Sequence, residues 1–127
     1  MLHFPTSSDI TIEVNGRKLA VAQQYRAQTT RESRYVEAFG STEPAGTVGG
    51  RVKHVLELTR VCVLAETLSD GIDFHGLSGF NVVIAKPDRK IIYSGCEWAS
   101  IDETAGLGNV VLEAVSIVAS KRMELKG

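Results

Sequence analysis

The sequence alternates apolar and polar residues with a period of two over much of its length. Residues 10–14 read Ile-Thr-Ile-Glu-Val, and residues 51–64 continue the alternation with many β-branched side chains. This period is typical of strands that bury one face. The longest apolar run covers only residues 61–65, whereas a membrane helix needs about 20 such residues. The chain is therefore expected to be mostly β, with no membrane insertion by itself.

Turn signals divide the alternating pattern into strands. Asn15-Gly16 favours a tight hairpin turn between residues 10–14 and a long return strand over residues 17–30. The pattern predicts a short α-helix over residues 72–77 and a charged tail over residues 121–127. Further strands are predicted over residues 34–39, 51–64, 80–85, 90–101 and 110–120. About seven strands joined by hairpins indicate an antiparallel β-sandwich or open barrel with one short α-helix.

The length and net charge of the chain limit its number of domains and its possible functions. The 127 residues suit a single domain over residues 1–127, in which residues 1–9 form an N-terminal extension. The 14 Lys and Arg residues against 15 Asp and Glu residues give a net charge of −1. A protein that holds nucleic acid mainly by neutralising phosphates needs a basic surplus, so that class is disfavoured.

A glycine-rich stretch interrupts the strands at residues 40–50. Four of its eleven residues are glycine and one is proline, so neither a helix nor a strand is expected to run through it. A loop this long in a small domain is usually functional. We expect an extended arm that becomes ordered against a partner. Its candidate contact residues are Thr42, Glu43, Pro44, Ala45, Thr47 and Val48.

Two predicted strands, residues 17–30 and 90–101, exceed the usual length of five or six residues. Both have polar residues on each face, so neither fits wholly within one small core. An exposed strand edge invites pairing with another chain. We therefore expect these long hairpins to pair between subunits.

Residues that often carry catalysis or bind metals are scattered. Cys62 and Cys96 are far apart, and His3, His54 and His75 occur singly, so no metal site or cofactor is predicted. The glycines near residues 46–50 and 106–108 lack the remaining residues of a phosphate or dinucleotide loop. No nucleophile lies beside a base. The chain is not expected to be an enzyme.

Several segments together resemble the tail tube proteins of bacteriophages and phage-like particles. They include residues 35–44 (Tyr-Val-Glu-Ala-Phe-Gly-Ser-Thr-Glu-Pro), residues 70–74 (Asp-Gly-Ile-Asp-Phe) and residues 94–98 (Ser-Gly-Cys-Glu-Trp). The segments 49–52, 58–61, 87–89 and 107–113 continue the similarity, which extends over about residues 10–120. The resemblance implies a structural protein that self-assembles into hexameric rings, stacked as a tube through which DNA or an effector passes.

The resemblance also implies partners and a location. Sheath, baseplate and tape-measure proteins would surround the tube in a virion tail assembled in the bacterial host cytoplasm, and DNA would pass through the lumen only transiently. The glycine-rich arm would then contact an adjacent ring. The polar even-numbered face of the long return strand, Gln24, Arg26 and Gln28, is predicted to line the lumen.

Other functions stay open at this point. The chain could form another ring of the same particle, such as a tail terminator or a baseplate tube-initiator, since these share the fold and differ in whether stacking continues. It could also be a small-ligand-binding β-barrel. Only 6% of the residues are aromatic, however, which leaves few side chains for the wall of a ligand pocket.

Overall fold

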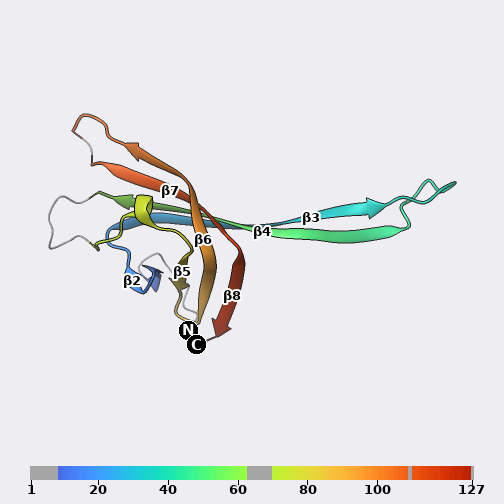
Figure 1. Cartoon of the computed structure of the whole chain (residues 1–127), viewed down its shortest axis with the longest axis horizontal. Coiled ribbons are helices and arrows are strands. Elements are labelled where there is room, and N and C mark those ends of the chain that lie inside the picture. The colour runs from blue at the N-terminus through green and yellow to red at the C-terminus, as the bar shows by residue number, and fades with distance from the viewer. Residues whose placement is uncertain (1–8, 63–69, 109, 127) are drawn as a thin grey trace, which may run out of the picture.

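A computed structural model describes residues 9–62, 70–108 and 110–126 of the chain. These residues form eight strands and one 3-10 helical turn, η3 (Figure 1). The elements are β1 (Thr11–Val14), β2 (Arg17–Lys18), β3 (Ala22–Val36), β4 (Gly46–Val61), η3 (Phe74–Gly76), β5 (Phe80–Ala85), β6 (Arg89–Thr104), β7 (Leu112–Ala119) and β8 (Lys121–Lys126). All the strand pairs in this part of the chain are antiparallel, which confirms the mostly β fold expected from the sequence.

The strands form two layers that share β6. The β1 layer has the order β2-β1-β5-β6-β8, and the β3 layer has the order β3-β4-β7-β6. Apolar side chains from both layers form one core, which includes Ile12, Val14, Leu56, Leu58, Val82, Ile84, Ile91, Tyr93, Val115 and Ile117. The sheet is open and is not closed into a barrel, so the alternative of a barrel that encloses a small ligand is wrong.

β6 passes from one layer to the other at Gly95. Residues 89–94 pair with β8, whereas residues 97–104 pair with β7. Gly95 has a φ of +62°, and a Cβ at this position would collide with the hydroxyl group of Ser120, which joins β7 to β8. The backbone N–H and the hydroxyl group of Ser120 both donate to the carbonyl oxygen of Ser94, each at 3.1 Å. The two antiparallel strands therefore bend together, and only glycine fits the bend without strain.

We expect the Gly95→Ala substitution to lower the free energy of unfolding by about 2–3 kcal/mol, because it adds a steric collision to left-handed backbone strain. Gly16→Ala is the matched control. Gly16 also has a positive φ, +81°, but a Cβ there would have no heavy atom within 4 Å. Urea unfolding of both variants separates the two contributions. If both variants lose the same free energy of unfolding, the collision with Ser120 does not contribute to the effect of Gly95→Ala.

The predicted Asn15-Gly16 turn is confirmed. Both residues have positive φ, 50° and 81°, and the flanking pair Val14 and Arg17 starts the β1–β2 hairpin. The long return strand predicted over residues 17–30 is interrupted, however. Val21 has a φ of 51°, and the chain leaves the β1 layer at residues 19–21 before β3 begins in the other layer.

Two further expectations need correction. The helix predicted over residues 72–77 is a single 3-10 turn, because Asp73 caps it through the N–H of His75 and Leu77 already has extended backbone. The predicted charged tail is a strand, β8, which pairs with β6 from Ser94/Lys121 to Arg89/Lys126. Alternation is weak in β8 because all six of its residues are exposed at the edge of the sheet.

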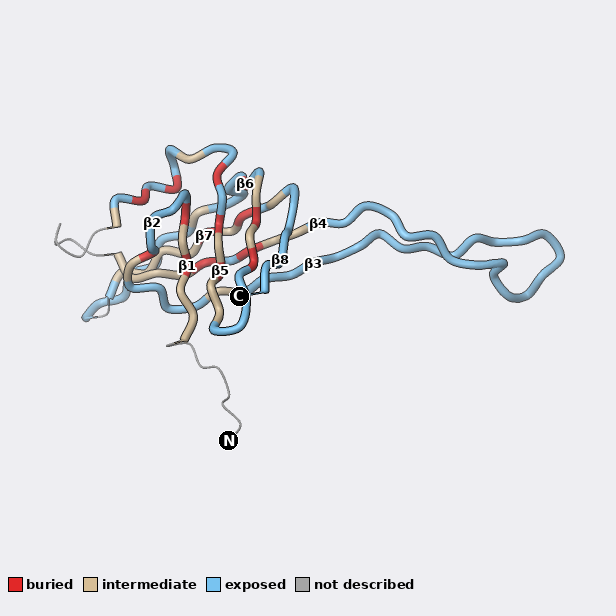
Figure 2. Tube along the Cα trace, turned by 90° about the horizontal axis from the view of Figure 1, so that it is seen from below, coloured by how far each residue is buried: buried red, intermediate tan, exposed pale blue. Residues whose placement is uncertain are grey.

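The β3–β4 hairpin extends far beyond the two layers (Figure 1). β4 pairs with β7 only from residue 54 onward, so in the described chain residues 46–53 have only β3 beside them. Residues 26–53 are all exposed, and in Figure 2 the buried segments are confined to the body of the molecule. We call residues 30–53 the arm and residues 37–45 the arm tip.

Candidate functional site

The arm is a regular two-stranded ribbon with one irregularity. Pairing shifts between Arg31/Val52 and Ser33/Gly49. A Cβ on Gly50 would collide with the backbone carbonyl oxygen of Glu32, so this position requires glycine. The expectation that no strand runs through residues 40–50 is wrong for residues 46–50, since here the glycines permit an irregular pairing instead of ending the strand.

The residues predicted to make arm contacts divide between the tip and the strand. Ala45 precedes β4 directly, and its N–H donates to the carbonyl oxygen of Val36 at 2.8 Å, which closes the ribbon. Thr42, Glu43 and Pro44 lie in the tip, and Thr47 and Val48 lie in β4. All six are exposed. Their role in contacts with a partner stays a prediction.

The arm tip also carries an aromatic residue that the sequence analysis did not single out. Phe39 is fully exposed, at 111% of its reference area. The hydroxyl group of Ser41 donates to the carbonyl oxygen of Glu43 at 2.7 Å and accepts from the N–H of Glu43 at 3.2 Å, so a local turn holds the tip. Its signal in the sequence was an isolated phenylalanine directly before a glycine-rich segment. Tyr35, Val36 and Val48 nearby are exposed too, so the end of the arm carries apolar surface that a partner can cover.

The β3 layer has two open edges. In the described chain β3 pairs only with β4, and residues 97–104 of β6 pair only with β7. Each edge therefore presents a row of backbone N–H and C=O groups without a strand partner. Long exposed edges of this kind are templates for pairing with another chain.

The outer face of the β3 layer, which points away from the core, is polar and carries the three predicted lumen residues. Gln24, Arg26 and Gln28 are exposed on β3, while Tyr25 between them packs against the core. A guanidinium nitrogen of Arg26 lies 3.8 Å from a carboxylate oxygen of Glu57 across the strand pair. Short side chains continue the face across β4, β7 and β6, among them Thr59, Ala114, Ser116 and Ser100. That these three residues line a lumen stays a prediction.

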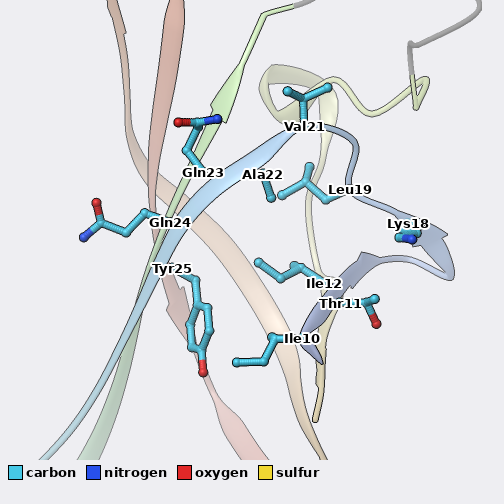
Figure 3. Close-up of a pocket in the computed structure, with 10 residues that line it drawn as sticks. All are labelled: Ile10, Thr11, Ile12, Lys18, Leu19, Val21, Ala22, Gln23, Gln24 and Tyr25. Carbon is cyan, nitrogen blue, oxygen red and sulfur yellow. The ribbon is translucent and has the colours of Figure 1, made fainter. Parts of the chain in front are cut away.

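A groove of about 540 Å³ is lined by residues 10–12, by Lys18 and Leu19, and by residues 21–25 at the start of β3. Figure 3 shows Ile10, Ile12 and Leu19 pointing toward β3, with Tyr25 pointing toward Ile10. Gln24 points away on the opposite side of β3 (Figure 3). The groove is mostly apolar, and Lys18 is the one charged residue among those that line it.

A second pocket of about 550 Å³ lies where the arm leaves the body. It is lined by residues of β3, β4, β5, β6 and β8 and by the first residue of the β5–β6 turn. Its lining includes one lysine, Lys86, and one arginine, Arg122. Nδ1 of His54 lies 3.0 Å from the hydroxyl oxygen of Thr29, and the His54 ring packs edge-on against Tyr93. We call this the basic pocket.

One partly buried charge cluster connects β4, β7 and residues 70–74. The guanidinium of Arg60 donates to Asp70 at 3.1 Å, to Glu113 at 3.0 Å and to the carbonyl oxygen of Ile72 at 2.7 Å. It also lies 5.0 Å from the centre of the Phe74 ring. Through these contacts the guanidinium ties β4 to Glu113 of β7 and to residues 70–74. The cluster was not predicted, because its members are far apart along the chain.

The pKa of Asp70 reflects competing causes in this cluster. Burial raises the pKa, but the backbone N–H groups of Ala20 and Ile72 and the charge of Arg60 outweigh it and hold the pKa below its usual value. Both N–H groups donate to the carboxylate, at 2.8 and 2.9 Å. Asp70 therefore remains ionised when folded and also fixes the chain just before β3 begins.

Neither cysteine is suited to nucleophilic or metal chemistry. Burial raises the pKa of Cys96 to about 11, and burial together with the carboxylates of Glu113 and Glu103 raises that of Cys62. Thiols with raised pKa values stay protonated near neutral pH. Within the described ranges, no three His, Cys, Asp or Glu side chains gather as a metal site would require. No helix in the same ranges is long and apolar enough to cross a membrane.

Comparisons with known proteins bear on the fold. No protein-family model matches the chain, and no curated protein matches it. Among solved structures, a chain of the virion of a native gene transfer agent particle has a TM-score of 0.69 and 16% identity, over 96% of this chain and 98% of that one. The SPP1 tail tube has a TM-score of 0.69 and 11% identity, over 97% and 80%. The tube-terminating cap of the anti-feeding prophage has a TM-score of 0.72 and 6% identity, over 100% and 94%.

These similarities cover nearly the whole chain and include the long hairpin. At such low identities they show a shared fold. The resemblance to tail tube proteins that the sequence suggested is thus confirmed in the three-dimensional structure.

Proposed function

We propose that this chain, which has the fold of phage tail tube proteins, is a structural subunit that self-assembles into rings stacked as a tube. The observation that carries the proposal is the pair of open edges on the β3 layer, formed by β3 and by residues 97–104 of β6. The chain would act as a single domain over residues 1–127. Residues 1–9 would be an extension of it, and residues 40–50, with the rest of the arm, would make its contacts to other rings.

Ring closure follows from pairing the two edges of successive subunits. The β3 edge of one copy would pair with the β6 edge of the next, so that the contact is head-to-tail. A head-to-tail contact that closes by rotation gives a ring and leaves no free edge. The similarity to tail tube proteins supports six subunits in the ring.

In such a ring the outer face of the β3 layer would line the lumen. The β1 layer covers the opposite face of the β3 layer and would therefore lie at the larger radius. Gln24, Arg26 and Gln28 would then face the channel, with the charge of Arg26 balanced by Glu57. A wall of short polar groups with little net charge lets DNA pass without binding tightly.

The outer face of the β1 layer would face other components of the particle. Val83, Ile92 and Met123 are aligned across neighbouring strands there, and Met123 is 58% exposed. This apolar row supports a contact with a sheath protein, and the ends of the tube would contact baseplate and tape-measure proteins. The place of action would be a virion tail assembled in the bacterial host cytoplasm. No catalytic role is part of the proposal.

A second candidate is the ring that ends the tube. It is favoured by the similarity to the tube-terminating cap, whose TM-score of 0.72 is the highest of the three compared. A terminator would form the same ring but would not add further copies along the axis.

Electron microscopy of the purified protein with size-exclusion chromatography tests both candidates. A tube subunit gives rings that stack into hollow tubes as the protein concentration rises. A terminator stops at single rings or ring pairs at all concentrations. A protein that remains monomeric at high concentration would contradict ring assembly altogether.

A further inference from the structure

We propose that the arm tip of one copy docks into the basic pocket of a second copy in the adjacent ring. The inference rests on the proposed tube and names the surface that receives the arm. It follows from the charges of the two surfaces, from the exposure of Phe39 and from the direction of the arm.

The basic pocket combines basic and apolar side chains. Lys86 and Arg122 line it together with Tyr25, Ile84 and Ile91. No acidic residue lines the pocket. The nearest carboxylate along β8, that of Glu124, is engaged by the guanidinium of Arg89, an exposed pairing that lowers the pKa of Glu124.

The arm tip has the complementary chemistry. Residues 35–50 contain two carboxylates, Glu37 and Glu43, and no lysine or arginine. Phe39 lies between them in sequence and is fully exposed. This tip is complementary to the basic pocket. Its carboxylates can pair with Lys86 and Arg122, while the phenyl ring of Phe39 is removed from water against the apolar side chains of the pocket.

A second copy is required because the arm points away from its own pocket. Figures 1 and 2 show the ribbon leaving the body without folding back, while the pocket lies at the base of the arm. Strands rise by about 3.3 Å per residue, so the seven residues of β3 from Thr30 to Val36 place the tip more than about 20 Å beyond the base. A contact between one end of a subunit and the base of another repeats indefinitely, as stacking requires.

The groove between β1 and β3 is the competing receptor. It is about equally large, but Lys18 is its one charged lining residue. Charge complementarity therefore favours the basic pocket. The competing groove supplies the control for the experiment.

Charge reversal tests the docking. Glu37→Lys with Glu43→Lys, and separately Lys86→Glu with Arg122→Glu, should each abolish sedimenting tubes while single rings remain. The variant with all four substitutions should recover tubes, because the complementary pairs are rebuilt with opposite sign. Lys18→Glu should assemble as the unaltered protein does. Circular dichroism of each variant checks that the fold is retained.

A zero-length carbodiimide crosslink on tubes of the unaltered protein gives a direct readout by mass spectrometry. Links from Lys86 to Glu37 or Glu43 are expected in tubes and not in isolated rings. Links from Lys18 to the tip, or tubes that persist in both reversed variants, would overturn the docking while the tube itself stands. Absence of rings and tubes from the unaltered protein would instead overturn the proposed function and the docking with it.

Discussion

A chain in which residues 31–52 are replaced by Asn-Gly will fold as a stable protein that forms no tubes. Thr30 and Lys53 are direct partners in the β3–β4 ladder, so a two-residue turn can join them without changing the register. None of the buried core residues lies between positions 31 and 52. The free energy of unfolding should therefore change by no more than about 1 kcal/mol.

The trimmed chain distinguishes the two kinds of subunit contact. It keeps both open edges of the β3 layer, so single rings should still form, and electron microscopy would show rings without stacks. Phe39→Ser in the full-length arm is the matched point variant, and it should weaken stacking without affecting thermal unfolding. Normal tubes from the trimmed chain would show that stacking does not use the arm.

The sequence predicted those parts of the fold that depend on neighbouring residues, and it missed parts that depend on contacts with distant segments. The Asn15-Gly16 turn and the strand over residues 80–85 are set by adjacent residues, and both were predicted correctly. The interruption at Val21 was missed, because a β-branched residue with positive φ contradicts its own preference and is held there by its surroundings. β8 was missed because an exposed edge strand has no buried face to impose alternation.

In the candidate site, too, the sequence predicted features set by neighbouring residues and missed those set by tertiary contacts. The polar face of β3 follows from alternation, so Gln24, Arg26 and Gln28 could be grouped from the sequence. The basic pocket could not be predicted, since Lys86 and Arg122 are brought together only by the pairing of β5, β6 and β8. The bend at Gly95 lets β8 pair with β6 and so brings Arg122 to the pocket. A single glycine within a predicted strand was not enough to predict that bend.

Replacing Arg60 by methionine should destabilise the fold by about 3 kcal/mol at pH 7, because it leaves two largely desolvated carboxylates without their cation. The side chains of Asp70 and Glu113 are only 8% and 15% exposed. Urea unfolding of the trimmed chain is the suitable measurement, since subunit association would otherwise add to the apparent stability. Arg26→Met is the matched control. Its pair with Glu57 is more than half exposed, so its loss should cost less than about 1 kcal/mol.

The difference between the Arg60→Met variant and the parent should shrink in acid. In the parent the folded-state pKa of Asp70 is lowered, so its stabilisation is present above the unfolded value of about 3.9 and is lost as the pH falls through the folded value. In the variant, Ala20 and Ile72 still donate to the carboxylate, but loss of the Arg60 charge leaves the pKa of Asp70 higher than in the parent, so the variant has less stabilisation to lose as the pH falls. A deficit that stays constant from pH 7 to pH 3 would mean that Arg60 stabilises the fold by packing on Phe74 and not by charge.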